Sequence, residues 1–308
     1  MAVVGARVKS VCIAGVGTIG SLLAGHLGRV TDVSVLVRRE EHARALNRDG
    51  LRVTGRADFT ARVTAATDPA DLPQPELVIV ACKGSDLAEI AARIEGEFDE
   101  ATVMTIQNGL GAENVVKAHG DWPLLSSVTF MSGTRHSDTH VEYILDTATW
   151  IGPNRGTTPA DARLVADLLV TAGLRAEPFD DLRPAQWSKL IFNATVNGVA
   201  ALTGLPHDEH FAGEPLGQLV HALMEEGKAA AAAAGVDLQE DPWEMNVLAT
   251  QRGSKHSPSM LEDVRAQRAT EVELINGSLV RAAREHGAAA PLQETIYALV
   301  RGKEASYA

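Results

Sequence analysis

The chain has 308 residues, of which 45% are hydrophobic and 22% are charged. These values are typical of folded globular proteins and exclude a disordered or collagen-like chain, and the length suffices for two domains of about 150 residues. The formal net charge of −12 argues against a nucleic acid or an anionic membrane as partner, because binding to phosphates needs clustered Lys and Arg. An anionic ligand would therefore need a local basic site.

The chain contains two cysteines, Cys12 and Cys82, each inside or at the end of an apolar run. This is typical of core residues in a reducing compartment and not of a disulfide scaffold. The sequence has no run of about 18 apolar residues that could span a membrane, and residues 1–7 lack the apolar stretch of a signal peptide. The expected location is the cytoplasm.

Short apolar, β-branched runs alternate with helical stretches over residues 8–179. This pattern predicts a parallel sheet with helices on both faces, and the continuity of the apolar runs indicates strands that are buried on both sides. The predicted strands of this sheet are 8–14, 32–37, 77–82, 102–106 and 124–130. Two further strands, 141–144 and 148–151, and a helix over 159–172 are predicted to follow.

After Pro178 the strand pattern stops and long helical segments follow. The predicted helices are 184–202, 215–234, 242–251, 259–285 and 291–301. The change predicts a boundary near Asp180 or Asp181, between an α/β doubly wound domain of residues 1–180 and an all-helical domain of residues 181–308. The apolar face of 215–234 is equally compatible with a homodimer surface and with packing inside its domain.

A glycine-rich segment follows the first predicted strand and opens a predicted helix. In its G-x-G-x-x-G pattern the first glycine allows a tight turn, the second lets the backbone approach a pyrophosphate, and the third allows the helix to pack on the strand. The phosphate would lie at the helix N-terminus. We therefore predict a dinucleotide site; the alternative is a turn kept for packing alone. Its expected cofactor-binding residues are Gly15, Gly17, Thr18, Ile19 and Gly20.

The ends of three other predicted strands bear on the cofactor. Arg38 and Arg39 follow the second strand, where an acidic residue would bind a free ribose 2′-hydroxyl and an arginine a 2′-phosphate, so NADP(H) is favoured over NAD. Glu40 is the counter-argument if its side chain turns inward. Lys83 and Asn108 follow two further strands; a solvated loop lysine and an Asn-Gly turn are the alternatives there.

Three polar residues recur at a spacing of four in an otherwise apolar segment. Lys189, Asn193 and Asn197 would lie along one face of a helix. Buried polar groups need partners, so this face predicts a ligand cleft. His207 and His210 raise the question of a metal site, but two ligands without a third do not make one, and no metal is predicted.

Six segments together resemble the ketopantoate reductase family, the 2-dehydropantoate 2-reductases that use NADPH, over nearly the whole chain. They are GVGTIG at 15–20, LVR at 36–38, CKGSD at 82–86, IQNGLG at 106–111, the W-x-K-L-x-x-N-x-x-x-N pattern at 187–197 and SMLEDVRAQRATEVELING at 259–277. The resemblance implies a Rossmann-type domain joined to an all-helical domain, with the active site in the cleft between them.

The resemblance also implies roles for single residues. Lys189 matches the general acid that protonates the ketone oxygen, where negative charge develops as hydride arrives. Glu271 matches the carboxylate that holds the substrate hydroxyl and pairs with the lysine. The positions that match substrate or nicotinamide contacts are Asn108, Asn193, Asn197 and Ser259, and those that match other cofactor contacts are Arg38 and Lys83.

Two positions depart from the family pattern and bear on what is bound. Gly198 stands where the family more often has proline, and His207 stands near the substrate where asparagine is usual; an imidazole changes charge with pH. The expected function is NADPH-dependent reduction of ketopantoate to pantoate on the route to pantothenate and coenzyme A. The alternatives are reduction of another branched or hydroxylated 2-oxoacid and, in another class, a nucleotide-binding sensor without turnover.

Overall fold

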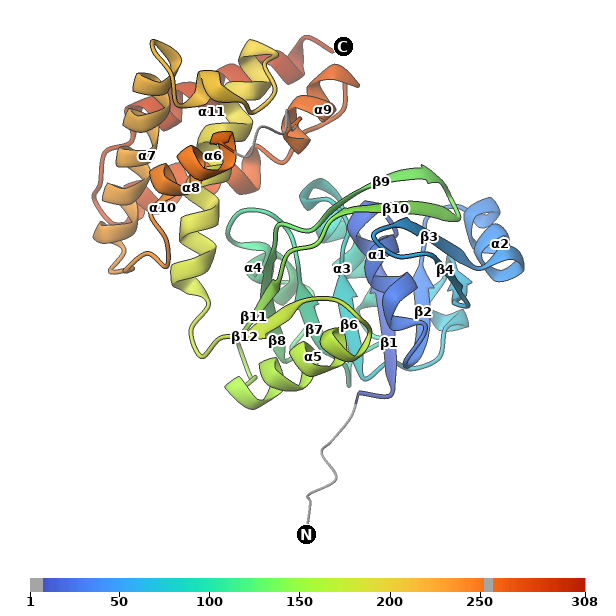
Figure 1. Cartoon of the computed structure of the whole chain (residues 1–308). Helices are drawn as coiled ribbons and strands as arrows, with labels where there is room; N and C mark the ends of the chain where they lie inside the picture. The colour runs from blue at the N-terminus through green and yellow to red at the C-terminus, as the bar shows by residue number, and fades with distance from the viewer. Residues whose placement is uncertain (1–7, 252–256, 308) are drawn as a thin grey trace. The chain divides into compact units, whose positions relative to one another are not determined.

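A computed structural model describes residues 8–251 and 257–307 of the chain. The chain forms two compact units: Met1–Gln107 with Ala112–Leu182, and Asn108–Gly111 with Arg183–Ala308 (Figure 1). The segment 1–7, in which no signal peptide is predicted, lies outside the described residues. No helix in the described part of the chain is long and apolar enough to cross a membrane.

The first unit is built on an eight-stranded sheet in the order β12-β11-β8-β7-β6-β1-β2-β5. Pairing is parallel from β5 to β8, whereas β11 runs antiparallel to β8. All five predicted parallel strands are present, each one or two residues shorter than expected. The strands are β1 (Ser10–Ala14), β2 (Asp32–Leu36), β5 (Thr64–Ala66), β6 (Leu77–Val80), β7 (Thr102–Thr105), β8 (Leu124–Thr129), β11 (Thr149–Pro153) and β12 (Ala176–Pro178).

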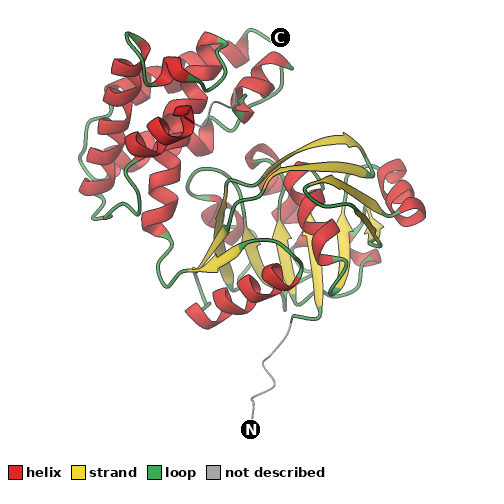
Figure 2. Ribbon diagram, viewed as in Figure 1, coloured by secondary structure: helices red, strands yellow, loops and turns green. Residues whose placement is uncertain are grey.

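Both faces of this sheet are buried, and alternate side chains of each strand contribute to opposite faces. On one face, Val11 and Ile13 share a core with α1 (Thr18–Leu27), α2 (Glu40–Asp49) and α5 (Pro159–Thr171). On the other face, Cys12 and Ala14 share a core with α3 (Leu87–Ile94) and α4 (Ala112–Lys117). Helices on both faces (Figure 2) confirm the predicted doubly wound arrangement.

The sequence does not predict a second sheet, which has four strands in the order β4-β3-β10-β9. Val53, Val141 and Tyr143 of this sheet join the same core as α1. β9 has the polar sequence SGTRHS and is largely exposed, so no apolar run marks it. The strands are β3 (Leu51–Gly55), β4 (Phe59–Ala61), β9 (Ser132–Ser137) and β10 (His140–Leu145).

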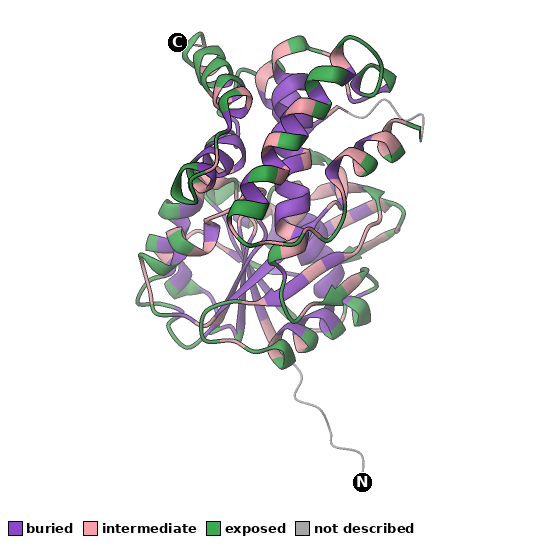
Figure 3. Ribbon diagram, turned by 90° about the vertical axis from the view of Figure 1, so that its left-hand side faces the viewer, coloured by how far each residue is buried: buried purple, intermediate pink, exposed green. Residues whose placement is uncertain are grey.

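The second unit contains only helices and loops in its described part. Its longest helix, α6, is buried along most of its length (Figure 3). Leu223 and Met224 of α7 belong to the unit's own core, which accounts for the apolar face of α7 without a homodimer. The helices are α6 (Arg183–Thr203), η3 (Glu209–Phe211), α7 (Leu216–Ala233), α8 (Pro242–Gln251), α9 (Ser259–Arg265), η4 (Glu273–Gly277), α10 (Ser278–Glu285) and α11 (Pro291–Ala305).

The single helix predicted over 259–285 is wrong, because α9 ends at Arg265. Gln267 has a φ of 50°, and the Arg268 amide donates to the Asp263 carbonyl at 2.9 Å while the Gln267 amide donates to Val264 at 3.1 Å. This is a Schellman ending with glutamine at the left-handed position that glycine usually takes. The sequence therefore carries no glycine to mark the stop.

Candidate active site

The glycine-rich turn joins β1 to α1 in the first unit. Gly15 has a φ of 100°, and a Cβ on it would lie 2.6 Å from a backbone nitrogen at the end of β6; a Cβ on Gly20 would overlap the Gly15 carbonyl. Gly17 is the N-cap of α1, and apart from Gly17 and its two chain neighbours, no atom of the described residues lies within 4 Å of the place a Cβ would take. Thr18 and Ile19 are half-buried in the first turn. The open space beside a helix N-terminus fits a phosphate group.

The two arginines after β2 have different partners. Arg38, whose side chain is 64% exposed, forms an ion pair with Asp86 at 3.2 Å. Arg39 donates two hydrogen bonds to Asp138, at 2.6 and 2.7 Å. A guanidinium held by a bidentate carboxylate is already engaged, so the exposed Arg38 is the better placed of the two to bind an anion.

Glu40 and Lys83 complete this edge of the sheet. The Thr67 hydroxyl, just beyond β5, donates to the Glu40 carboxylate. Lys83 is exposed and follows β6. Since β6 and β2 flank β1 in a parallel arrangement, the structure brings Lys83, Arg38 and the glycine-rich turn to one edge, where open α/β sheets bind ligands.

The second unit gathers residues that are distant in sequence. α6 places Lys189, Asn193 and Asn197 on a buried face, with exposures of 7%, 9% and 6%. Asn193 Nδ2 donates to Asn108 Oδ1 at 3.4 Å, and Asn108 Nδ2 donates to Glu271 Oε2 at 3.0 Å. Residues from α6, the loop 108–111 and the segment before η4 thus form one polar group.

The surroundings of Lys189 shift its pKa. Burial lowers the pKa of its ammonium from 10.5 to about 8, and the negative charge of Glu271 offsets part of this effect. Removal from water disfavours the charged form. A lysine with this pKa gives up its proton more readily than a free lysine but still carries it at neutral pH. The group can therefore protonate an oxygen that gains negative charge.

Two predicted residues stand apart from these hydrogen bonds. Ser259 is the exposed first residue of α9, and among the described residues no hydrogen bond joins it to the Lys189 group. Asn197 is buried one turn beyond Asn193, and its side chain forms no hydrogen bond with another residue in the described ranges. Buried amides need hydrogen-bond partners, so the Asn197 side chain is suited to bind a ligand.

The sequence gives no role to Gln107, which precedes the loop. Its Nε2 donates to the carbonyls of Val80 at 2.8 Å and Cys82 at 3.0 Å. Gln107 therefore ties the end of β7 to the end of β6. Only its position directly after a predicted strand could have indicated this contact.

His207 braces its own loop on α8. Its Nε2 lies 2.9 Å from Asn246 Oδ1, and Asn246 Nδ2 donates to the Phe211 carbonyl at 2.9 Å. Since the Asn246 amide nitrogen is the donor to Phe211, the imidazole donates to its oxygen. The ring also packs edge to face on Phe192 and Phe211. These contacts account for a histidine at this position.

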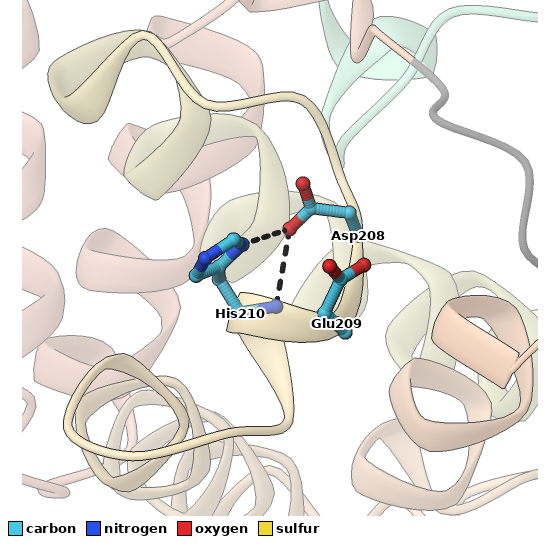
Figure 4. Close-up of side chains that lie close together, drawn as sticks. All are labelled: Asp208, Glu209 and His210. Atoms are coloured by element: carbon cyan, nitrogen blue, oxygen red, sulfur yellow. Dashed lines mark hydrogen bonds and ion pairs between the residues drawn. The ribbon is translucent and has the colours of Figure 1, made fainter.

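A neighbouring acidic cluster has a local explanation as well. Asp208, Glu209 and His210 hold ligand atoms within 4.8 Å of one another (Figure 4). Asp208 is the N-cap of η3, and it accepts hydrogen bonds from the backbone and Nδ1 of His210 at 3.1 and 2.8 Å. Such capping is ordinary at a helix start. These hydrogen bonds account for the arrangement of the cluster within its loop.

Packing accounts for the departure at Gly198. A Cβ on Gly198 would overlap Cγ2 of Ile296 on α11. Both residues are buried, so neither can move without disturbing the core. Glycine at this position is therefore explained by the contact between two helices.

Comparison with known proteins gives one family. Residues 11–156 match the family described as Ketopantoate reductase PanE/ApbA, and residues 181–304 match Ketopantoate reductase PanE/ApbA C terminal. The 2-dehydropantoate 2-reductase of Halobacterium salinarum is 32% identical, over 94% of this chain and 97% of its own.

Solved structures share the fold. The PanE/ApbA family ketopantoate reductase from Ralstonia eutropha JMP134 has a TM-score of 0.88 at 26% identity, covering 97% of this chain and 99% of its own. D-mandelate dehydrogenase, in its ternary structure with NADH and anilino(oxo)acetate, has a TM-score of 0.87 at 22% identity with the same coverage. This second likeness concerns the fold alone.

Proposed function

Because the chain belongs to the ketopantoate reductase family, we propose that it is an NADPH-dependent oxidoreductase that reduces 2-dehydropantoate to pantoate, on the route to pantothenate and coenzyme A. The observation that carries the proposal is the polar group in the second unit: a buried lysine with a lowered pKa, two asparagines and a carboxylate. Similarity to 2-dehydropantoate 2-reductases over nearly the whole chain supports the same substrate.

The residues of this group suit the reduction of a ketone. When bound, NADPH supplies a hydride to the carbonyl carbon. Lys189 stabilises the negative charge that develops on the carbonyl oxygen and donates a proton to it. Glu271 accepts a hydrogen bond from the substrate hydroxyl and favours the protonated form of Lys189. Asn193 and Asn197 orient the substrate through their amides.

We assign NADP(H) as the cofactor within this NAD(P)-dependent family. Arg38 is the proposed partner of the 2′-phosphate, because its one ion pair, with Asp86 at 3.2 Å, is longer than the two hydrogen bonds, at 2.6 and 2.7 Å, by which Arg39 is held on Asp138. Lys83 supplies a second cation at the same edge, and the open space at Gly17 suits the pyrophosphate. Residues 1–180 would then act as the NADP-binding domain and residues 181–308 as the substrate domain.

The location is proposed from the cysteines. Cys12 and Cys82 are not joined by a disulfide, which supports a reducing compartment. We therefore place the enzyme in the cytoplasm.

Two rival functions have less support. Gly198 and His207 favoured a different 2-oxoacid, but contacts with Ile296 and Asn246 account for both residues. A nucleotide sensor has no need for a buried lysine, because burial of a charge is costly without a function that uses it. The buried polar group of the second unit therefore supports an enzyme that turns over its substrate, and not a sensor.

Steady-state kinetics of the purified chain test the proposal. NADPH oxidation is followed with ketopantoate and with a panel of branched and hydroxylated 2-oxoacids. We expect kcat/KM to be at least about tenfold higher for ketopantoate than for the others. A clear preference for another acid would retire ketopantoate as the substrate, and tight NADPH binding without oxidation would favour the sensor.

A further inference from the structure

The loop that carries Asn108 docks on the π-helical turn η4 through its backbone. The Leu110 amide donates to the Leu274 carbonyl at 3.1 Å, and the Leu110 side chain packs against the core of the second unit. A Cβ on Gly109 would overlap the Leu274 carbonyl oxygen and lie 3.1 Å from the Ile275 nitrogen. The backbone therefore approaches η4 more closely than any residue with a side chain allows.

The same turn also fixes the backbone of Glu271. The amides of Leu274 and Ile275 both donate to the Glu271 carbonyl, at 3.1 and 3.0 Å. π-helical turns are rare and occur often at functional sites. The turn η4 thus binds the Glu271 carbonyl through two of its amides. It binds the loop that carries Asn108 through the Leu274 carbonyl.

We infer that Gly109 is a positioning residue for the reaction, which sets the carboxamide of Asn108 against the carboxylate of Glu271. Asn108 alone could rotate about its own bonds, but docking of the adjacent backbone leaves its Nδ2 3.0 Å from Glu271 Oε2. A displacement of about 1 Å at a reacting group can cost about 100-fold in rate. The inference rests on the proposed function, because it assumes that Glu271 acts on the substrate.

The matched pair Gly109→Ala and Gly111→Ala tests this role. Both glycines lie in one loop with left-handed backbones, at φ 97° and 93°, so alanine strains both. A Cβ on Gly111 would have no atom of the described residues within 4 Å apart from Gly111 and its two chain neighbours. We expect Gly109→Ala to lower kcat/KM by about 10- to 100-fold and Gly111→Ala to change it far less. Equal losses in the two variants would overturn the inference.

A double-mutant cycle separates positioning from general damage. In an Asn108→Ala background the carboxamide is already gone. Adding Gly109→Ala should therefore lower kcat/KM by less than about a further twofold. A full additional loss in that background would show that Gly109 acts on something other than Asn108, and would overturn the inference.

Hydrogen exchange of the Leu110 amide needs no turnover, and in the wild-type chain it needs no variant. In the wild-type chain this amide should be protected like the helical amides of the second unit; fast exchange would overturn the inference. Gly109→Ala should speed the exchange and Gly111→Ala should not. A wild type with a protected Leu110 amide that oxidises no NADPH would contradict the proposed function and leave the docking intact.

Discussion

Lys189 is both buried and charged, and this fixes how the rate should depend on pH. As the proposed acid, the lysine can act only while it holds its proton, and burial lowers its pKa to about 8. The kcat/KM of the wild type should therefore be level below about pH 8 and fall roughly tenfold per pH unit above it. A profile that stays level to pH 10 would contradict the role of Lys189.

The Glu271 carboxylate should affect the pH at which kcat/KM begins to fall. Glu271 raises the pKa of Lys189, so Glu271→Gln should shift the fall to lower pH. Glu273→Gln is the matched control, because Glu273 binds Arg281 and Tyr297. A limb that moves equally in both variants would show that the shift does not come from Glu271.

The two arginines after β2 offer a test of cofactor choice. Arg38→Ala removes the proposed partner of the 2′-phosphate and should raise the Kd for NADPH by about 10- to 100-fold, as expected for a charge-assisted hydrogen bond. The Kd for NADH should stay unchanged. Arg39→Ala is the control, since Arg39 is held by Asp138. If Arg39→Ala weakened NADPH binding more than Arg38→Ala did, the assignment would be reversed.

At the residue level, local spacing explains which predictions succeed. Lys189, Asn193 and Asn197 share a face because they lie on one helix, and helical spacing is visible in the sequence. The contacts of Asn108 with Asn193 and Glu271 join segments 85 and 163 residues apart, so only the family resemblance pointed to them. The contact between Gly198 and Ile296 has the same long-range origin.

Among elements, α6 and α11 meet at Gly198, which makes a stability prediction. Gly198→Ala would press a methyl group into Ile296 in a packed core, and overpacking of this kind costs about 1–3 kcal/mol. Thermal or denaturant unfolding measures the loss. Gly198→Ala should cost less in an Ile296→Ala background, where Cγ2 is absent.

Gly302→Ala serves as the control for this change. Gly302 lies in α11, and beyond its chain neighbours and the nearby backbone of α11, a Cβ on it would meet nothing in the described part of the chain within 4 Å. An alanine there should stabilise the chain by about 0.5–1 kcal/mol through the lower backbone entropy cost. If Gly198→Ala were as stabilising as Gly302→Ala, the packing explanation would fail.

Elements were predictable where their chemistry is regular. The buried parallel strands form continuous apolar runs, whereas β9 is polar and, of its sheet, only the strand over 141–144 is predicted. The helix predicted over 259–285 fails because glutamine, not glycine, takes the left-handed position after α9. Patterns of hydrophobicity cannot reveal a backbone turn that ordinary residues make.

At the scale of the whole molecule, the chain passes between the two units three times, after Gln107, Gly111 and Leu182. A composition change marks the last of these passages, close to the boundary at 180/181 expected from the sequence. The loop 108–111 has no such mark, since it lies between two segments of the first unit. Its membership of the second unit follows from its docking on η4.

In the proposed reaction, the proton comes from Lys189. Replacing Lys189 by alanine and measuring turnover of ketopantoate at saturating NADPH tests it most directly, with Lys228→Ala as control because Lys228 is bound to Glu225 and Asp241. We predict that Lys189→Ala lowers kcat by about 100- to 10,000-fold, with the Kd for NADPH unchanged and Lys228→Ala like the wild type. A kcat for Lys189→Ala close to that of the wild type would contradict the claim.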